Sequence, residues 1–267
     1  MIKQVVSMLD SEISTGIAIN PHQRQGHDEL MKAGSAAEDL ISRAVDLFQS
    51  GLALATSFSI EDVALIHMLV SADPGKKATI LAIDTGRLPE DTFACAQALI
   101  RKYAIEIEWL YPNPQRLANF VSSQGLYSFK ESLEARKECC YIRKVEPLRR
   151  RLRTLSAWIT GQRREQTHLR SQLQVVEIDK ANGSIVKLNP LCYWTSEQVF
   201  QYVKHNNIPY SRLYDRGYKS IGCAPCTRPV APHEDERAGR WWWESDEHKE
   251  CGIHVGEANT ACANDRQ

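Results

Sequence analysis

Short apolar runs alternate with helical stretches through the first half of the chain, and this alternation limits the fold more than any other feature. Residues 52–56, 78–84 and 105–110 are apolar runs of the length of buried strands. A helical pattern follows the first run over 60–70, and Thr85-Gly-Arg-Leu-Pro89 opens a second helix. Strands that alternate with helices predict a parallel sheet covered by helices on both faces. We therefore expect a Rossmann-like α/β fold.

The flanking stretches carry further local signals. Pro147 should end or kink a long helical stretch over 129–153. Asn182-Gly183 is a strong turn signal between two alternating runs, and Thr195-Ser-Glu-Gln198 has the pattern of a capping box. The remaining predictions are a helix over 30–48, a strand over 157–160, a hairpin of 174–179 with 185–188, a helix over 195–206 and a loop from 208 onward.

These signals divide the chain into three parts. We expect a loosely held N-terminal arm at 1–29, which is mixed and turn-rich, and an α/β domain at 30–233. The C-terminal segment at 234–267 contains three consecutive tryptophans at 241–243 and is predicted to be a mobile or docking tail. Nothing in the sequence indicates an internal repeat or a second hydrophobic core.

Polar turns follow the first two predicted strands. Ser57-Phe-Ser59 follows the first strand, and Asp84-Thr-Gly-Arg87 follows the second. Both turns should lie at the carboxyl edge of the sheet, where open α/β sheets bind their ligands. Hydroxyls and free amides at a helix N-terminus suit a phosphate or sulfate. The same residues also occur as plain helix caps, so the turns alone leave both roles open.

Two cysteine pairs stand far apart in the sequence. Cys139 and Cys140 are adjacent, which makes a disulfide between them difficult. Cys223 and Cys226 form a second pair, and the four thiolates together would make a tetrathiolate site for zinc or an iron–sulfur cluster. Lys144 is four residues after Cys140 and would share its helical face. The alternative is that the first pair is simply two small buried residues.

Charge and length exclude several functional classes. The 267 residues include 33 basic and 33 acidic side chains, so no overall positive field indicates nucleic acid. We see no signal peptide and no apolar run long enough to span a bilayer. Eight cysteines without a secretory signal are typical of a cytoplasmic protein that uses them for metal binding or catalysis.

One further cysteine has neighbours that favour reactivity. Cys251 lies between Lys249 and His254, and nearby cations lower the pKa of a thiol and favour its reactive thiolate. Gly252 would allow close approach of the backbone. A solvated cysteine in a tail is the alternative. The other cysteines, Cys95, Cys192 and Cys262, have no such neighbours and are predicted to be inert.

Taken together, these motifs resemble the assimilatory adenylyl-sulfate (APS) reductases, from about residue 52 to 255. The resemblance is carried by Ser57-Phe-Ser-Ile-Glu-Asp62, Asp84-Thr-Gly-Arg-Leu-Pro89, Cys139-Cys-Tyr-Ile-Arg-Lys144, Glu146-Pro-Leu148, Gly161-Gln-Arg-Arg-Glu165, Ile221-Gly-Cys-Ala-Pro-Cys-Thr-Arg-Pro229, Arg240-Trp-Trp-Trp-Glu244 and Lys249-Glu-Cys-Gly-Ile-His254. The family has leucine where this chain has Ile253, a conservative difference. The resemblance implies a fold related to the adenine-nucleotide alpha-hydrolases of the PP-loop type.

The resemblance also implies an activity and its residues. Adenosine 5′-phosphosulfate would be reduced to sulfite and AMP, with Cys251 as the nucleophile and S-sulfocysteine as the intermediate. Thioredoxin, or glutaredoxin, would be the reductant. Cys139, Cys140, Cys223 and Cys226 would hold one [4Fe-4S] cluster, with Lys144 between the cluster and the sulfate. The other expected substrate-binding residues are Arg170, Arg237, Arg240, Ser57, Ser59, Thr85 and Gly161, with Arg163 and Arg164 either joining them or forming a solvated pair.

Several alternatives remain open at this stage. Reduction of the 3′-phosphorylated nucleotide, or dual specificity, uses the same nucleophile motif, although the four cluster cysteines favour APS. A tRNA thiolation enzyme is more remote, because its glycine-rich ATP loop is replaced here by Ser57-Phe-Ser59. A zinc module that binds nucleic acid through the arginines at 149–153 conflicts with the zero net charge. Neither nucleic acid nor membrane is expected as a partner, and the sequence leaves open whether the chain forms a homo-oligomer.

Overall fold

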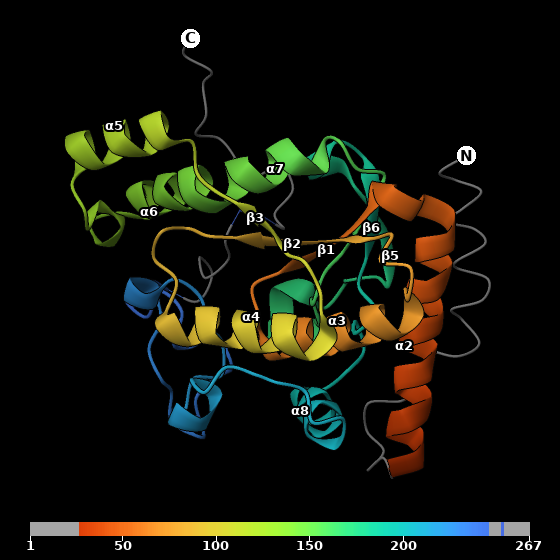
Figure 1. Cartoon of the computed structure of the whole chain (residues 1–267). Helices are drawn as coiled ribbons and strands as arrows, with labels where there is room; N and C mark the ends of the chain where they lie inside the picture. The colour runs from red at the N-terminus through yellow and green to blue at the C-terminus, as the bar shows by residue number, and fades with distance from the viewer. Residues whose placement is uncertain (1–26, 246–251, 254–267) are drawn as a thin grey trace.

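The computed structural model describes residues 27–245 and 252–253, with side chains described from residue 36 onward. Its centre is a six-stranded sheet (Figure 1). The strands are β1 (Leu52–Thr56), β2 (Thr79–Ile83), β3 (Glu108–Leu110), β4 (Ala157–Ile159), β5 (Val176–Asp179) and β6 (Ile185–Leu188). Each predicted strand is therefore present, somewhat shorter than its apolar run where the ends turn toward the surface.

The strand order is β3-β2-β1-β4-β6-β5. All neighbouring pairs are parallel except β5 and β6, which form the predicted antiparallel hairpin. From β1 the chain winds outward through β2 to β3, and then returns to place β4 on the opposite side of β1. The order thus reverses between β1 and β4, and such a reversal opens a crevice at the carboxyl ends of the two strands.

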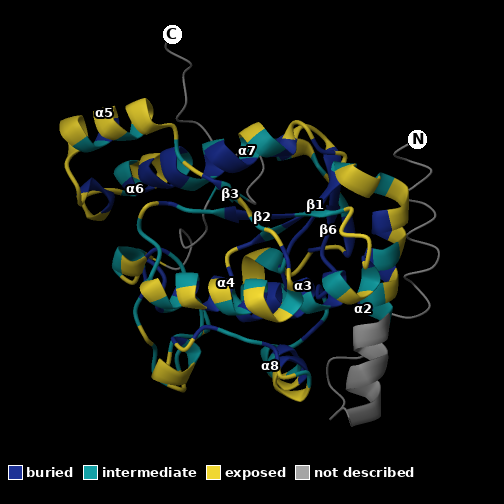
Figure 2. Cartoon of the chain, viewed as in Figure 1, coloured by how far each residue is buried: buried dark blue, intermediate teal, exposed yellow. Residues whose placement is uncertain are grey.

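Helices cover both faces of the sheet, as the alternation predicts (Figure 1). One face carries α2 (His27–Phe48), α3 (Ile60–Ala72), α4 (Glu90–Tyr103) and α8 (Ser196–His205); the other carries α5 (Pro114–Gln124), α6 (Leu133–Cys140) and α7 (Glu146–Leu152). Both faces of β1 are buried, since Leu52 and Leu54 pack into the larger core and Ala53 into the smaller one beneath α7 (Figure 2). Burial on both faces explains why the strand is a continuous apolar run.

The long helical stretch of the sequence is interrupted immediately after the cysteine pair. α6 ends at Cys140, residues Tyr141–Val145 form one π-helical turn, and α7 continues to Leu152. Pro147 lies in the first turn of α7, where a proline is tolerated, so the disturbance precedes it. The four-residue spacing between Cys140 and Lys144 is therefore not that of a regular α-helix. Single π turns of this kind are frequent at functional sites.

The three tryptophans are docked on the domain. Trp241 is only 1% exposed and Arg240 is buried beside it, while Trp242 remains partly exposed. The Arg136 side chain donates to both carboxylate oxygens of Glu244, at 3.0 and 2.8 Å. Of the two expectations for this stretch, a mobile or a docking segment, residues 240–244 follow the second. Within the described residues, no helix has both the length and the apolar character needed to cross a membrane.

Candidate functional site

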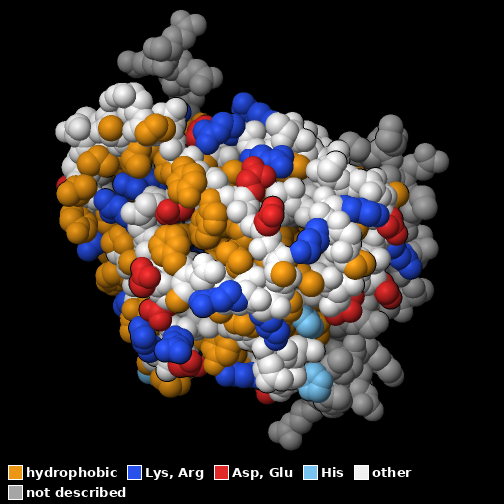
Figure 3. Space-filling model, viewed as in Figure 1, with side chains coloured by type: hydrophobic (Ala, Val, Ile, Leu, Met, Phe, Trp, Pro, Cys, Tyr) orange, Lys and Arg blue, Asp and Glu red, His pale blue; other side chains and the backbone are white. Residues whose placement is uncertain are grey.

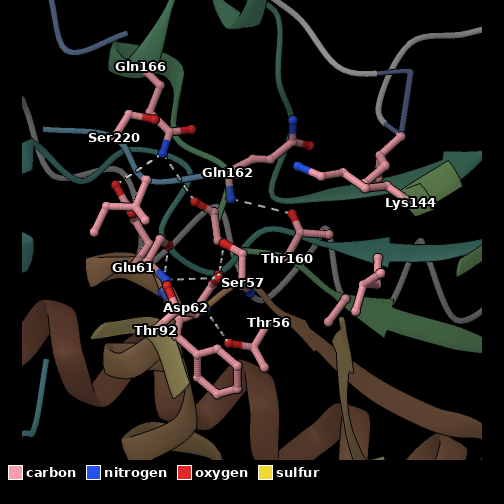
Figure 4. A pocket seen from close by; sticks show the side chains of 18 of the residues that line it. Thr56, Ser57, Glu61, Asp62, Thr92, Lys144, Thr160, Gln162, Gln166 and Ser220 are labelled. Carbon is pink, nitrogen blue, oxygen red and sulfur yellow. Dashed lines mark hydrogen bonds between the residues drawn. The ribbon is translucent and has the colours of Figure 1, made fainter. Parts of the chain in front are cut away.

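A large crevice lies where the strand order reverses (Figure 4). Together with its open mouth it spans about 1260 Å³. Its floor is formed by the ends of β1, β2 and β4. Every predicted substrate-binding residue lines it, namely Ser57, Ser59, Thr85, Lys144, Gly161, Arg170, Arg237 and Arg240. The structure thus brings together eight side chains or backbone positions that the sequence separates by more than 180 residues.

The turn after β1 has an unusual backbone. Ser59 caps α3 in a reciprocal capping box with Asp62, whose amide donates to Ser59 Oγ at 3.2 Å. Phe58 has φ 60°, in the left-handed region that favours glycine, and its amide donates to Thr56 Oγ1 at 2.9 Å. Burial of the Phe58 ring against the larger core holds this conformation in place.

The amides of this turn are not free, contrary to the sequence-based expectation. Asp62 Oδ2 accepts hydrogen bonds from Ser57 N at 2.6 Å, Ser57 Oγ at 2.9 Å and Ser59 N at 3.4 Å. The next amide, of Ile60, donates to the hydroxyl of Tyr214 at 2.8 Å. The donors expected to meet a phosphate or sulfate already have partners within the protein. Figure 4 shows the Asp62 side chain turned toward Ser57.

Asp62 is held in a buried position against the loop that follows β4. Burial raises the pKa of its carboxyl from 3.8 to about 6, and the adjacent Glu61 adds to this effect, while the hydrogen bonds from Ser57 and Ser59 oppose it. A Cβ added to Gly161 would lie 2.5 Å from Asp62 Oδ1 and 2.9 Å from Glu61 Cβ. Only glycine at this position allows the β4 loop to approach α3 so closely.

Four cationic side chains line the crevice. Lys144 projects from the π turn and lies across the crevice from Asp62 (Figure 4). Arg170 donates to Gln166, and Arg237 and Arg240 come from the segment that precedes the tryptophans. Lys144 stands across the crevice from Asp62, whereas Arg170 is linked through Gln166 to Glu61, the neighbour of Asp62. An anionic ligand group is stabilised beside these cations.

Arg163 and Arg164 do not belong to this set of cations. Arg163 is completely buried and forms ion pairs with Glu61 at 2.8 Å and Glu236 at 2.8 Å. Arg164 stacks over the Tyr193 ring at 4.5 Å and donates to a backbone carbonyl. Neither arginine lines the crevice, and Arg163 is not solvated, so both expectations for it are wrong. Its role is to tie α3 to the segment that carries Arg237.

The four cysteines of the two pairs line one small cavity. Cys139 and Cys140 reach it from the end of α6, and Cys223 and Cys226 from a loop whose Ala224 amide donates to Arg87 O at 2.8 Å. Thr85 links this cysteine cavity to the crevice, because its hydroxyl lies 3.3 Å from Cys223 Sγ. Lys144 and Arg240 line both cavities.

Basic side chains surround the cysteine cavity. They are Arg87, Arg136, Arg143, Lys144 and Arg240. Burial raises the pKa of Cys139, and it raises the pKa of Cys226 to about 11. Burial acts on Cys223 in the same direction, but Lys144, the Thr85 hydroxyl and Arg240 outweigh it, so the pKa of Cys223 lies below its ordinary value. Of these three thiols, Cys223 is the one whose surroundings favour negative charge on sulfur, whereas burial disfavours it on Cys139 and Cys226.

The donor set consists of cysteine sulfurs, which are ligands of both zinc and iron–sulfur clusters. Among the residues that the structure describes, no three histidine, cysteine or carboxylate side chains converge as ligands of one metal ion. Cysteines that surround a cavity match a cluster, in which each thiolate binds a different iron. Arg240 Nε and Trp241 Nε1 are buried at this cavity without a hydrogen-bond partner among the described residues, and sulfur atoms of a cluster could accept from them.

Cys251 lies outside the described residues, but the next two residues do not. Ile253 lines the crevice and packs on the smaller core, and its carbonyl oxygen lies 3.5 Å from Asn182 Nδ2. A Cβ on Gly252 would lie 3.7 Å from Val145, at the end of the π turn. Gly252 and Ile253 thus lie at the crevice beside the element that carries Lys144.

Sequence reasoning missed several residues of the crevice. Glu61 and Asp62 belong to a motif of the resemblance without an expected role, although an Asp three residues after Ser59 is a capping signal. Sequence reasoning also missed Gln162, which is 4% exposed and whose Oε1 has no hydrogen-bond partner in the described part of the chain. No local signal could have found Tyr214, which reaches the turn after β1 from a distant loop.

Two of the spare cysteines are buried in the domain. Burial raises the pKa of Cys95 to about 12 and that of Cys192 to about 11. Thiols with such pKa values are almost entirely protonated at neutral pH and react slowly. Cys262 lies outside the described residues.

Comparison with known proteins places the chain in a family. The model of the phosphoadenosine phosphosulfate reductase domain matches residues 51–229. The chain is 47% identical over 201 residues to the adenosine 5′-phosphosulfate reductase of Burkholderia cepacia, covering 75% of this chain and 79% of that protein. It is 43% identical over 230 residues to the adenosine 5′-phosphosulfate reductase of Allochromatium vinosum, covering 86% and 88%.

Solved structures share the fold at lower sequence identity. The phosphoadenylyl-sulfate reductase of Candida auris superimposes with a TM-score of 0.61 at 24% identity, covering 78% of this chain and 99% of that one. The FMN adenylyltransferase of Candida glabrata has a TM-score of 0.56 at 13% identity, covering 92% and 82%. These likenesses confirm the predicted α/β fold. On the strength of the domain match and the two bacterial relatives, the chain belongs to the family of adenosine 5′-phosphosulfate and phosphoadenosine phosphosulfate reductases.

Proposed function

We propose that the protein reduces adenosine 5′-phosphosulfate to sulfite and AMP in assimilatory sulfate reduction. The observation that carries this proposal is the crevice at the strand ends, which is lined by four cations, Lys144, Arg170, Arg237 and Arg240, and by Ile253, two residues after Cys251. The identity to bacterial proteins named adenosine 5′-phosphosulfate reductase supports the choice of substrate.

The geometry suits an adenine nucleotide with an anionic end. Polar groups of Ser57, Thr85 and Gly161 line the strand ends, where nucleotides lie in open α/β sheets. The phosphosulfate would extend toward Lys144, Arg237 and Arg240, because these cations offset its charge. Such neutralisation is the main physical requirement of the reaction, since an anionic thiolate must approach an anionic sulfate ester.

The proposed reaction proceeds in two chemical stages. The Cys251 thiolate attacks the sulfur of the sulfate group, the bond from that sulfur to the bridging oxygen breaks, and AMP leaves with the electron pair. A thiolate of reduced thioredoxin then attacks the Cys251 sulfur and sulfite departs. The second thiol of thioredoxin resolves the mixed disulfide, so the dithiol supplies both electrons. Glutaredoxin is the alternative reductant, and the cytoplasm is the compartment that keeps either one reduced.

We further propose that Cys139, Cys140, Cys223 and Cys226 hold one [4Fe-4S] cluster. The fit rests on the four cysteines around one cavity, the five surrounding cations and the unpartnered donors of Arg240 and Trp241. When bound, the cluster would order the site and add fixed negative charge beside it. Lys144 and Arg240 would then lie between that charge and the sulfate. Negative charge on each side would hold the two cations in place.

The distribution of charge on the surface argues against the alternative of a zinc module that binds nucleic acid. Arg151 forms a two-pronged ion pair with Glu108 at 2.8 and 3.1 Å, and Arg150 pairs with Glu146 at 2.6 Å. Two members of the arginine cluster are thus partly neutralised. On the face drawn in Figure 3, basic and acidic side chains are interspersed rather than gathered in one basic patch.

The test is sulfite release by anaerobically purified protein with reduced thioredoxin. We expect kcat/KM for adenosine 5′-phosphosulfate to exceed that for the 3′-phosphorylated nucleotide by at least roughly a hundredfold, about 2.8 kcal/mol at the transition state. A dianionic 3′-phosphate requires cations placed to meet it, and the family motif with four cysteines favours the unphosphorylated substrate. Comparable values would show a dual-specific reductase, and no sulfite from either would contradict the proposal.

A further inference from the structure

We propose that Asp62 is a specificity-determining residue that occupies an anion cradle and keeps phosphate groups out of the turn after β1. The anion cradle consists of Ser57 N–H, Ser57 Oγ–H and Ser59 N–H, which all donate to Asp62 Oδ2. The inference rests on the proposed function for its consequence, which is that the phosphosulfate is directed toward Lys144, across the crevice.

The cradle has the form of a phosphate-binding turn. It lies between a parallel strand and the N-terminus of a 13-residue helix, where backbone N–H groups and the helix dipole favour an anion. The left-handed Phe58 turns the backbone so that the amides on its two sides point at one oxygen atom. The protein therefore supplies an anion of its own, a side-chain carboxylate, where such turns bind ligand phosphates.

The backbone conformation shows that glycine is not what distinguishes this turn from an ATP-binding one. The turn Ser57-Phe-Ser59 lacks the glycines of an ATP-binding loop. Phe58 nevertheless adopts φ 60°, the conformation for which glycine would be used. What prevents the turn from receiving a phosphate is the occupied cradle, not the shape of the backbone.

Asp62 cannot easily vacate the cradle. It is 5% exposed, and Gly161 leaves so little space that a single added methyl would lie 2.5 Å from Oδ1. A phosphate that approached the turn would compete with a fixed carboxylate for the same donors and would be repelled by its charge in a poorly solvated site. Lys144, across the crevice, offers the opposite environment, so the anionic end of a nucleotide is favoured beside it.

The consequence is that the protein discriminates between nucleotides by the position of their anionic group in the crevice. A nucleotide whose reactive anion must reach the turn after β1 is rejected, whereas one whose anion extends toward Lys144 is accepted. Asp62 would thus act without touching the reacting atoms. It would position the substrate by excluding the wrong location.

The test is direct binding of inorganic pyrophosphate and of AMP, measured by calorimetry on the holoprotein. Asp62→Ala should increase pyrophosphate affinity at least about tenfold, because the substitution removes the repulsion between the carboxylate and the anion. A tenfold change is the size of an interaction that shifts a pKa by about one unit. Asp62→Asn keeps an oxygen for the cradle but removes the charge, so its gain should be smaller than that of alanine. Asp73→Ala is the matched control, because Asp73 is also buried and accepts from a backbone amide, of Ala78 at 2.8 Å, but lies outside the crevice.

A purely structural role for Asp62 predicts a different result. If Asp62 only stabilises the fold, both substitutions should lower the free energy of unfolding, and neither should raise the affinity for pyrophosphate. Unchanged or weaker pyrophosphate binding by folded Asp62→Asn and Asp62→Ala proteins would therefore overturn the inference. This readout needs no turnover, so a wild-type protein that fails to reduce adenosine 5′-phosphosulfate would contradict the proposed function and leave the pyrophosphate result to decide the inference.

Discussion

The guanidinium group of Arg240 lies directly against the backbone of Gly222. A Cβ on Gly222 would stand 2.3 Å from Arg240 Nη2 and 2.5 Å from Cζ, so no other residue fits there without displacing the arginine. The Trp241 ring lies 4.6 Å from the same guanidinium. Arg240 is thus fixed at the boundary between the crevice and the cysteine cavity, where it faces both.

Gly222→Ala should slow the formation of the sulfo adduct by at least about tenfold while changing AMP affinity less. The displaced guanidinium would lose its position beside the sulfate, and one misplaced charge-assisted contact is worth about 1.5–3 kcal/mol. Single-turnover AMP release and AMP binding would measure the two quantities. Gly75→Ala is the control, because a Cβ there meets ordinary contacts of 3.7 Å. Equal losses in both quantities would contradict the assigned position.

Lys144→Ala should likewise slow adduct formation more than it weakens AMP binding, because the charge that Lys144 meets is on the sulfate. The residue lines both cavities, so its removal also changes the electrostatic environment of Cys223. The rate of adduct formation and the affinity for AMP would be measured in parallel on the variant and the wild type. The account fails for this residue if the two fall together.

Cys139→Ser should abolish the visible iron–sulfur absorbance and most of the activity, because the cysteine cavity would lose one of its four ligands. Cys95→Ser is the matched control, since Cys95 is equally buried but lies outside that cavity. Iron and acid-labile sulfide would be measured on anaerobically purified protein. Equimolar zinc in the wild type, with no iron or sulfide, would rule out the cluster.

The raised pKa of Asp62 makes a signed prediction for stability. The folded state binds the proton more tightly than the unfolded state, about 6 against 3.8, so the stabilisation from this group is complete below pH 3.8 and is lost as pH rises through 6. Between pH 5 and pH 7, the free energy of unfolding of the wild type should fall by about 1 kcal/mol relative to Asp62→Asn. Anaerobic urea unfolding at several pH values measures this difference. A difference that rises over the same interval would show that Asp62 is not desolvated.

Local patterns in the sequence predicted most of the strands and helices, although not the π turn at Tyr141–Val145. The apolar run at Leu52–Thr56 and the capping box at Thr195 are read from neighbouring residues alone, and both are confirmed. The strand order could not be predicted in this way, because the placement of β4 beside β1 depends on packing between segments that are distant in the sequence.

The electrostatics of the site were the least predictable part. Arginines at 163 and 164 look alike in sequence, yet the first is buried among Glu61, Glu165 and Glu236 and the second stacks on a tyrosine. Asp62 could be expected as a capping residue but not as the occupant of the turn. That role depends on Gly161 and Tyr214, which are close to it only in the folded chain.

The central claim, attack of Cys251 on the sulfate sulfur, is tested most directly by one turnover without reductant. Anaerobic wild-type protein mixed with adenosine 5′-phosphosulfate should release AMP equal in amount to active sites and gain the mass of one sulfo group, located on the peptide that contains Cys251. Cys251→Ser should release no AMP and gain no mass, while it keeps its iron–sulfur absorbance. AMP release accompanied by free sulfate, or an adduct on Cys262 in place of Cys251, would contradict the account.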